Sequence, residues 1–208
     1  MSELFSIQLQ NRQQQGGDGV WLDLPTTTEQ VQAAPRQIGI SSDNPQGLFI
    51  SGYFAEEEKR FAIPYNMVLA SNVDELNFLA SRLETLSTGE RTELNAVLQA
   101  PQSELFSIGR ITDFPENVDY YVHLPDVHGP AQLGDYYLNR SGMVDMPEEW
   151  KGGIDTAQFG RYVAQQEQGA FTQYGYLVKS GDEWQKVHEG QPVPEEYRVL
   201  SFPVPEVM

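Results

Sequence analysis

The chain has 208 residues, of which 39% are hydrophobic and 11% aromatic, and 30 acidic against 13 basic residues give a net charge of −17. This length allows one domain or a few small modules with a real core. The chain contains no cysteine, which excludes disulfides, thiolate zinc sites and cysteine nucleophiles. No apolar run is long enough to span a membrane and the first residues lack a basic stretch, so we expect a cytoplasmic protein.

The acidic excess is spread along the chain and is greatest toward its end. The net charge is −4 in residues 1–70, −3 in residues 71–100 and −10 in residues 101–208. Such a field repels nucleic acid and anionic membranes and favours a basic partner. Because the acids alternate with large apolar residues, we expect them on a folded surface rather than in a polyacid tail. The alternative interpretation of the net charge is that the acidic surface serves only to keep the protein soluble.

Residues 1–69 predict an α/β module with the order β-β-α-β. Alternating apolar residues indicate a hairpin of two strands, Phe5, Ile7 and Leu9 in the first and Val20, Leu22 and Leu24 in the second. Thr26 and Glu29 form a capping-box pattern at the start of a helix, which Pro35 should shorten or kink. The stretch from Leu48 to Tyr53 predicts a third strand.

Residues 70–101 predict a helical module. Asn72 is a capping residue with Glu75 three positions later, and leucines then recur at helical spacing. Ser87 and Glu90 form a second capping box, and Pro101 stops the helix that follows. Two helices joined by so short a turn are typical of an αα-hairpin.

Residues 102–178 predict a second α/β module. A short helix capped by Ser103 should precede a strand over residues 119–123. Pro130 and Asp155 are expected to begin two further helices, and the second should turn Phe159, Tyr162 and Val163 inward. Residues 171–177 predict one closing strand. The remaining residues, 179–208, predict a β-rich C-terminal extension with strands near 184–187 and 197–202. The expected fold class is therefore α+β, built as an elongated chain of small modules.

The sequence gives weak support for catalysis. Glycine-rich phosphate loops and a nucleophile elbow are lacking. His123, Asp126 and His128 lie close together in sequence, but their spacing matches no standard zinc pattern. Asp113, Glu116 and Asp119 are three apart without the glycine and terminal glutamate of a calcium loop. We therefore predict no enzyme activity, no cofactor and no metal, and a small metal-dependent hydrolase using His123 and His128 stays an alternative.

Four stretches, taken in order, resemble the ArdA antirestriction proteins of mobile genetic elements. They are residues 72–80, residues 124–138 with the segment Leu-Gly-Asp-Tyr-Tyr-Leu, residues 159–164 with Phe-Gly-Arg-Tyr-Val-Ala, and residues 171–177 with Phe-Thr-Gln-Tyr-Gly-Tyr-Leu. The resemblance covers roughly residues 4–178 and leaves the last thirty residues outside. It implies three small modules paired into a curved homodimer, whose surface carboxylates imitate DNA phosphates and block the DNA groove of type I restriction-modification enzymes.

The charge is consistent with that implication. Duplex DNA carries one charge per roughly 1.7 Å of axis, so a charge of −17 corresponds to about 29 Å of duplex. The N-terminal module has a net charge of only −4, and we expect residues 101–178 with the adjoining helices to carry most of the mimicking surface. The candidate residues act collectively and are Asp113, Glu116, Asp119, Asp126, Asp135, Asp145, Glu148, Glu149 and Asp155. The alternative partner is another basic DNA-binding machine, such as a nucleoid protein or a CRISPR effector; neither nucleic acid nor a membrane is expected to bind.

Overall fold

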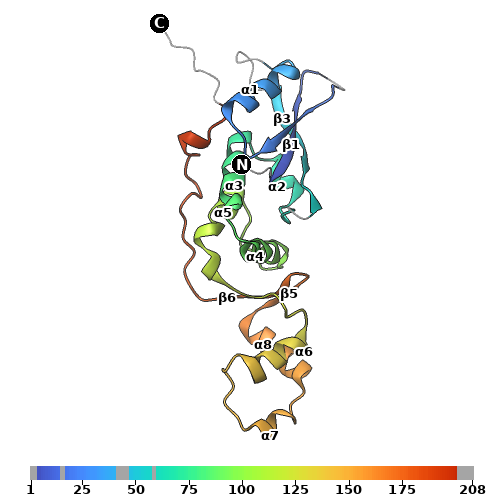
Figure 1. Cartoon of the computed structure of the whole chain (residues 1–208), viewed down its shortest axis with the longest axis vertical. Coiled ribbons are helices and arrows are strands. Elements are labelled where there is room, and N and C mark those ends of the chain that lie inside the picture. Colours follow the sequence, from blue (N-terminus) through green and yellow to red (C-terminus); the bar gives the residue numbers. More distant parts are fainter. Residues whose placement is uncertain (1–3, 15–16, 41–46, 58–59, 201–208) are drawn as a thin grey trace. The chain divides into compact units, whose positions relative to one another are not determined.

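A computed structural model describes residues 4–14, 17–40, 47–57 and 60–200 of the chain. The described residues group into two units that interleave along the sequence (Figure 1). Unit 1 comprises the described residues within Met1–Leu86, Phe106–Pro115 and Lys186–Met208, and unit 2 comprises Ser87–Leu105 and Glu116–Gln185. Both contain helices and antiparallel strands, so the predicted α+β class is confirmed. The division into four consecutive modules stays a prediction.

Unit 1 begins with the predicted β-β-α-β order. Its antiparallel sheet has the strand order β2-β1-β3 and contains β1 (Phe5–Asn11), β2 (Val20–Leu24) and β3 (Leu48–Phe54). In this register Ile7 pairs with Leu22 on one side and with Tyr53 on the other. Phe5, Ile7 and Leu9 are buried, which confirms the predicted inward face of the first strand.

The first helix, α1 (Thr28–Gln37), starts one residue later than the sequence predicts. Thr27 takes the N-cap position, and the side chain of Gln30 accepts a hydrogen bond from its N–H. Thr26 does not form the predicted capping box with Glu29, because its N–H donates to the buried Asn77 Oδ1 at 2.7 Å and its hydroxyl donates to Gln30 Oε1 at 2.8 Å. A tertiary contact therefore displaces the cap, and Pro35 is accommodated within the helix.

The helical predictions for residues 72–99 are confirmed. Asn72 caps α3 (Val73–Glu84) by accepting from the Glu75 N–H at 2.9 Å. Ser87 and Glu90 form the predicted capping box of α4 (Thr88–Gln99). The short helices of unit 1 are α2 (Tyr65–Leu69) and α5 (Ile108–Thr112). Ser107 rather than Ser103 caps α5, because the Ser103 hydroxyl accepts from Leu105 N–H in the preceding turn.

Unit 2 holds a second antiparallel sheet, in the order β4-β6-β5. The predicted single strand over residues 171–177 is wrong: it is a hairpin of β5 (Ala170–Thr172) and β6 (Gly175–Lys179). Gly175 makes the reversal possible, since its φ of 120° is a conformation that L side chains rarely adopt. β4 (Tyr121–Leu124) pairs with β6 on the other side. The turns before β4 are 3₁₀ helices, η3 (Phe114–Glu116) and η4 (Val118–Tyr120).

Two glycines let the main helices of unit 2 cross closely. A Cβ on Gly134 in α6 (Pro130–Asp135) would overlap the carbonyl oxygen of Thr156, and one on Gly160 in α8 (Thr156–Glu167) would overlap that of Pro130. Pro130 and Asp155 begin these helices as predicted. Tyr162 was expected to face inward but is 59% exposed, since the contact face of α8 is centred on Gly160. A π-helical turn, η5 (Tyr136–Arg140), extends α6, and α7 (Glu148–Lys151) follows.

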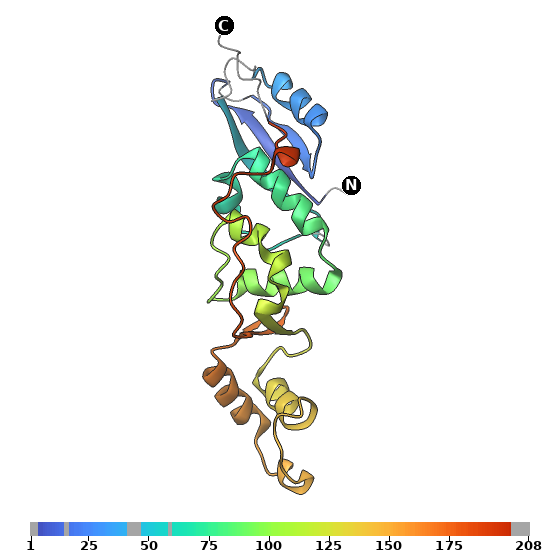
Figure 2. The same ribbon diagram turned by 90° about the vertical axis from the view of Figure 1, so that its left-hand side faces the viewer.

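The residues after β6 contradict the predicted β-rich extension. Between residues 180 and 200 the regular structure is the 3₁₀ helix η6 (Glu195–Tyr197), and the expected strand near 184–187 is absent from this described part. The expected strand over 197–202 is not formed up to residue 200, and its last two residues lie outside the described chain. We call residues 186–200 the C-terminal strap. Figures 1 and 2 show it running beside α3 and α5 within unit 1.

Side chains of α3 hold the strap in place of a sheet ladder. Asp74 Oδ1 accepts from the N–H groups of Val199 and Leu200 at 2.7 and 2.8 Å. Asn77 Nδ2 donates to the Tyr197 carbonyl at 3.1 Å, and the Phe78 ring lies 4.6 Å from that of Tyr197. Backbone groups that a strand would pair with another strand are thus satisfied by helix side chains.

Candidate functional site

Most of the candidate carboxylates lie on the surface of unit 2. Seven of the nine are exposed: Glu116, Asp119, Asp126, Asp145, Glu148, Glu149 and Asp155. They come from η3, η4, the loop after β4, the loop between η5 and α7, α7 itself and the cap of α8. Unit 2 has 14 acids against 5 bases in 89 residues, whereas unit 1 has 16 against 8 in 119. The acid excess per residue is therefore larger in unit 2.

Asp113 does not belong to this surface, and its prediction as a surface acid is corrected. Its side chain lies in unit 1 with 0% exposure. The two carboxylate oxygens accept backbone hydrogen bonds from Val187, His188 and Glu189 at 3.3, 2.6 and 3.1 Å. The carboxylate thus anchors the C-terminal strap, and a buried group used in this way cannot face a partner.

Three of the remaining candidates take part in local interactions. Asp135, which is partly exposed, accepts from Asn139 Nδ2 at 2.8 Å and lies 3.3 Å from Arg140 Nη2. Glu148 pairs with Lys151 at 2.6 Å, and Asp155 caps α8 by accepting from the Gln158 N–H at 3.0 Å. The orientation of these three side chains is therefore partly fixed by the fold.

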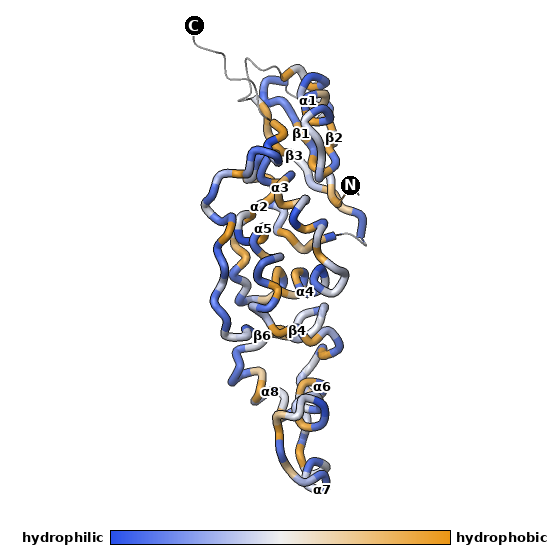
Figure 3. The backbone as a smooth tube through the Cα atoms, turned by 60° about the vertical axis from the view of Figure 1, so that its left-hand side comes forward, coloured by the Kyte–Doolittle hydropathy of each residue, from blue (hydrophilic) through white to orange (hydrophobic). Residues whose placement is uncertain are grey.

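Other exposed acids lie outside the predicted set. Asp182 and Glu183 follow the turn at Ser180, and both are exposed in unit 2. The sequence signal that identifies them is a pair of consecutive acids directly after Ser-Gly, which is typical of an exposed turn. Both lie beyond residue 178, outside the stretches that carry the family resemblance. In Figure 3 hydrophilic stretches recur in both units and alternate with hydrophobic ones.

A half-buried carboxylate lies below this acidic surface. Glu93 is on α4, and its Oε1 is buried without a hydrogen-bond partner among the described residues. Burial raises the pKa of Glu93 to about 8, with further increases from the carboxylates of Glu90 and Asp119. The neighbouring carboxylates therefore add to the effect of burial on Glu93.

The histidines do not form a metal centre in the described structure. His123 Nε2 lies 2.8 Å from the carbonyl oxygen of Tyr174, whereas His128 is exposed and its N–H donates to Gln132 Oε1. In residues 4–14, 17–40, 47–57 and 60–200, no three His, Cys, Asp or Glu side chains are grouped so that they could hold a metal ion. The geometry therefore gives no support to the metal-dependent hydrolase.

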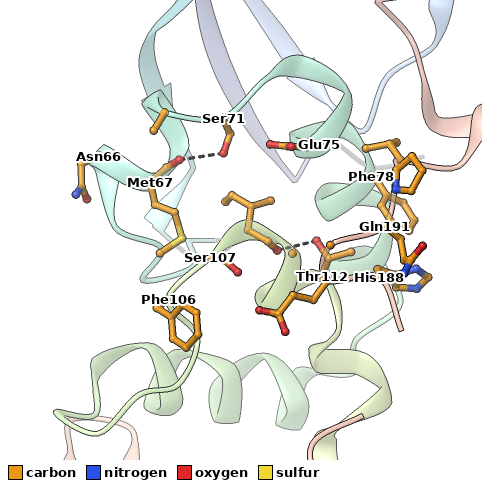
Figure 4. A pocket seen from close by; sticks show the side chains of 17 residues that line it. Asn66, Met67, Ser71, Glu75, Phe78, Phe106, Ser107, Thr112, His188 and Gln191 are labelled. Atoms are coloured by element: carbon orange, nitrogen blue, oxygen red, sulfur yellow. Dashed lines mark hydrogen bonds between the residues drawn. The ribbon is translucent and has the colours of Figure 1, made fainter. Parts of the chain in front are cut away.

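Unit 1 contains a cavity of about 710 Å³ between α2, α3, α5 and the C-terminal strap (Figure 4). Its hydroxyl groups serve the helices: Ser71 donates to the Met67 carbonyl, Thr112 to the Ile108 carbonyl, and Ser107 caps α5. The His188 ring packs edge-on against Phe78, 4.9 Å away. These contacts are structural, and they bring no hydroxyl nucleophile together with a base.

The comparison with known families identifies the chain. The model of the antirestriction protein ArdA matches residues 17–178, so the chain belongs to the ArdA antirestriction protein family. The suspected family is thereby confirmed, and it implies an antirestriction function directed at restriction enzymes. A search of curated protein sequences gave no match. The C-terminal strap lies beyond the matched residues. None of the helices in the described ranges has the length and apolar character needed to cross a membrane.

Proposed function

We propose that this chain inhibits type I restriction-modification enzymes by imitating duplex DNA. The observation that supports this most strongly is that a member of an antirestriction family exposes seven of the candidate carboxylates on unit 2. An enzyme that binds DNA presents Lys and Arg to the phosphates, and those contacts position the duplex without reading sequence. Carboxylates can engage the same basic groups, so the inhibitor competes for the DNA groove.

We further propose that the chain acts as a cytoplasmic homodimer without catalysing a reaction. A pair of chains carries a charge of −34, which corresponds to the phosphates of about 58 Å of duplex. The eight acids that remain after Asp113 is removed are the proposed contact set: Glu116, Asp119, Asp126, Asp135, Asp145, Glu148, Glu149 and Asp155. Because the attraction is distributed over many charges, neutralising a single carboxylate should reduce inhibition only slightly.

A displacement assay tests the mechanism. The chain is titrated into a type I methyltransferase bound to a labelled duplex, at two salt concentrations. We expect DNA to be released near stoichiometric amounts, and binding of the inhibitor to weaken as salt rises. If a folded sample releases no DNA, the target proposal is wrong, and the same assay with nucleoid proteins and CRISPR effectors tests the alternative partners.

Two matched triple variants test where the mimicry lies. One carries Asp126→Asn, Asp145→Asn and Glu149→Gln in unit 2; the other carries Asp18→Asn, Glu195→Gln and Glu196→Gln in unit 1. All six side chains are exposed, and each variant changes the net charge by the same amount. The unit 2 variant should displace less DNA. Equal loss of DNA displacement in both triple variants would contradict a contact surface on unit 2. In single variants, complete loss of displacement after neutralising one carboxylate would contradict a distributed mechanism.

A further inference from the structure

The sheet of unit 1 has one edge that the described structure leaves open. β2 is the end strand of the order β2-β1-β3, and no described residue forms backbone hydrogen bonds along its outer side. The opposite edge is covered, because α2 packs on β3 and the Tyr65 hydroxyl donates to the Ser51 carbonyl at 3.2 Å. An open edge strand presents N–H and C=O groups to which another extended chain can pair.

A groove of about 710 Å³ runs between β2 and α1. Residues 20–23 form one wall. On the other wall α1 contributes Ala33 and Ala34, whose small side chains leave room beside the strand. A helix lying next to an open strand edge is the arrangement in which a peptide binds by adding a strand to the sheet. Five residues of β2 allow pairing over about 17 Å.

The charge of the groove selects the kind of chain that can enter. Asp23 and Glu29 line it, and no Lys or Arg is among its lining residues. Trp21 lies two residues before Asp23, on the same exposed side of β2, and is 50% exposed. The Trp21 ring extends across β1 to Gly52, and Asp23 accepts a hydrogen bond from the Ser6 hydroxyl at 2.6 Å. Carboxylates in a groove without cationic lining residues favour the Lys and Arg side chains of a partner through ionic contacts.

We propose that the β2 edge binds an extended basic segment of a partner protein, which adds a fourth strand to the sheet and places cationic side chains beside Asp23 and Glu29. A second copy of this chain is a poorer occupant, because strand pairing between copies would bring the same carboxylates together. The interaction uses backbone pairing in unit 1, so it does not depend on DNA mimicry by unit 2.

A labelled peptide of seven residues that alternates valine and lysine is the probe, measured by fluorescence polarisation with the full chain at fixed salt. Two further peptides keep the charge but carry N-methyl groups on every second backbone amide. One is methylated at the odd positions and the other at the even positions, so that one of them blocks the amides that face β2. We expect at least one of them to bind about tenfold more weakly, since two backbone hydrogen bonds are lost. A peptide with glutamate in place of lysine should not bind. Equal binding of all three lysine peptides would overturn the proposal, because it would reflect charge attraction alone.

Variants of the groove locate the binding site. Ala33→Trp fills the groove from the helix side, and Ala131→Trp, at an exposed alanine of α6, is its matched control. We expect binding to weaken at least about tenfold in the first and to stay unchanged in the second, with folding checked by circular dichroism. Amide chemical shifts should move at Val20–Leu24. Equal binding of the two variants, or shifts confined to other residues, would overturn the proposal. Sedimentation that shows self-association abolished by Ala33→Trp would replace the basic segment with a second copy.

Discussion

The carboxylate of Asp113 accepts a 2.6 Å hydrogen bond from the backbone N–H of His188, a residue 75 positions later in the chain. Two neighbouring N–H groups of the strap bind the same carboxylate. A charged acceptor with three backbone donors is a strong anchor, and its loss leaves these donors without that partner. This side chain therefore stabilises unit 1.

We expect Asp113→Asn to lower the free energy of unfolding by about 1.5–3 kcal/mol, because the amide offers one accepting oxygen instead of two and no charge. Urea denaturation followed by circular dichroism measures the change. Asp126→Asn removes an exposed carboxylate and should change stability by less than about 0.5 kcal/mol. If the two variants unfolded at the same urea concentration, the anchoring role of Asp113 would be refuted.

The raised pKa of Glu93 predicts a pH dependence of stability. The folded chain keeps this proton up to a pKa of about 8, whereas the unfolded chain releases it near 4.5. The stabilisation that comes from this proton on Glu93 is therefore fully present below pH 4.5, and it is lost as the pH rises toward 8. Glu93→Gln should flatten this dependence, so the variant gains stability relative to the parent between pH 5 and pH 8. Urea midpoints at pH 5 and pH 8 measure this gain in stability, with the exposed Glu149→Gln variant as control. If the stability of the parent and that of Glu93→Gln changed in parallel with pH, the prediction would be contradicted.

Glycine substitutions in unit 2 should have opposite signs at two helical positions. Gly160→Ala places a Cβ against the Pro130 carbonyl, and forcing the helices apart should cost about 1–3 kcal/mol. Gly89→Ala, in the first turn of α4, has no neighbouring atom within 4 Å, so it should stabilise by up to about 1 kcal/mol. Thermal unfolding of both variants tests the close crossing of α6 and α8. A Gly160→Ala variant as stable as the parent chain would show that the two helices do not cross so closely.

The buried amide of Asn77 joins two distant segments of unit 1. Its Oδ1 accepts from the Thr26 N–H, and its Nδ2 donates to the Tyr197 carbonyl. Asn77→Ala should cost about 1–3 kcal/mol and speed hydrogen exchange at Thr26, whose N–H loses its acceptor. Asn66→Ala, an exposed position on α2, is the control. Unchanged exchange at Thr26 would show that another group protects this amide.

Local signals in the sequence predicted much of the fold. Capping residues such as Asn72, Ser87 and Asp155 act within one turn of helix, so their effect can be read without tertiary structure. The errors arose where distant contacts decide. The bond between Thr26 and Asn77 moved the first cap, and the side chains of Asp74 and Asn77 replaced an expected strand pairing in the strap.

The candidate site was predictable as a set of acids but not as a surface. Sequence shows that Asp113 is an acid near Glu116 and Asp119, all at three-residue spacing. It does not show that the strap returns to cover the first of them while the other two stay exposed. Burial depends on contacts between residues 113 and 187–189, and no pattern of local spacing encodes those.

The interleaving of the two units has a consequence for how the chain is made. A ribosome releases the sequence from the N-terminus, so β1, α3 and Asp113 all emerge before the N–H groups that Asp113 binds. Unit 2 is largely synthesised in that interval, since Glu116–Gln185 separates Asp113 from the strap. The strap contacts of Asp74, Asn77, Phe78 and Asp113 can therefore form only when the last part of the chain arrives. In a nascent chain halted at Gln185, Phe78 would lack its ring contacts with His188 and Tyr197, and the Asp113 carboxylate would lack its three strap donors.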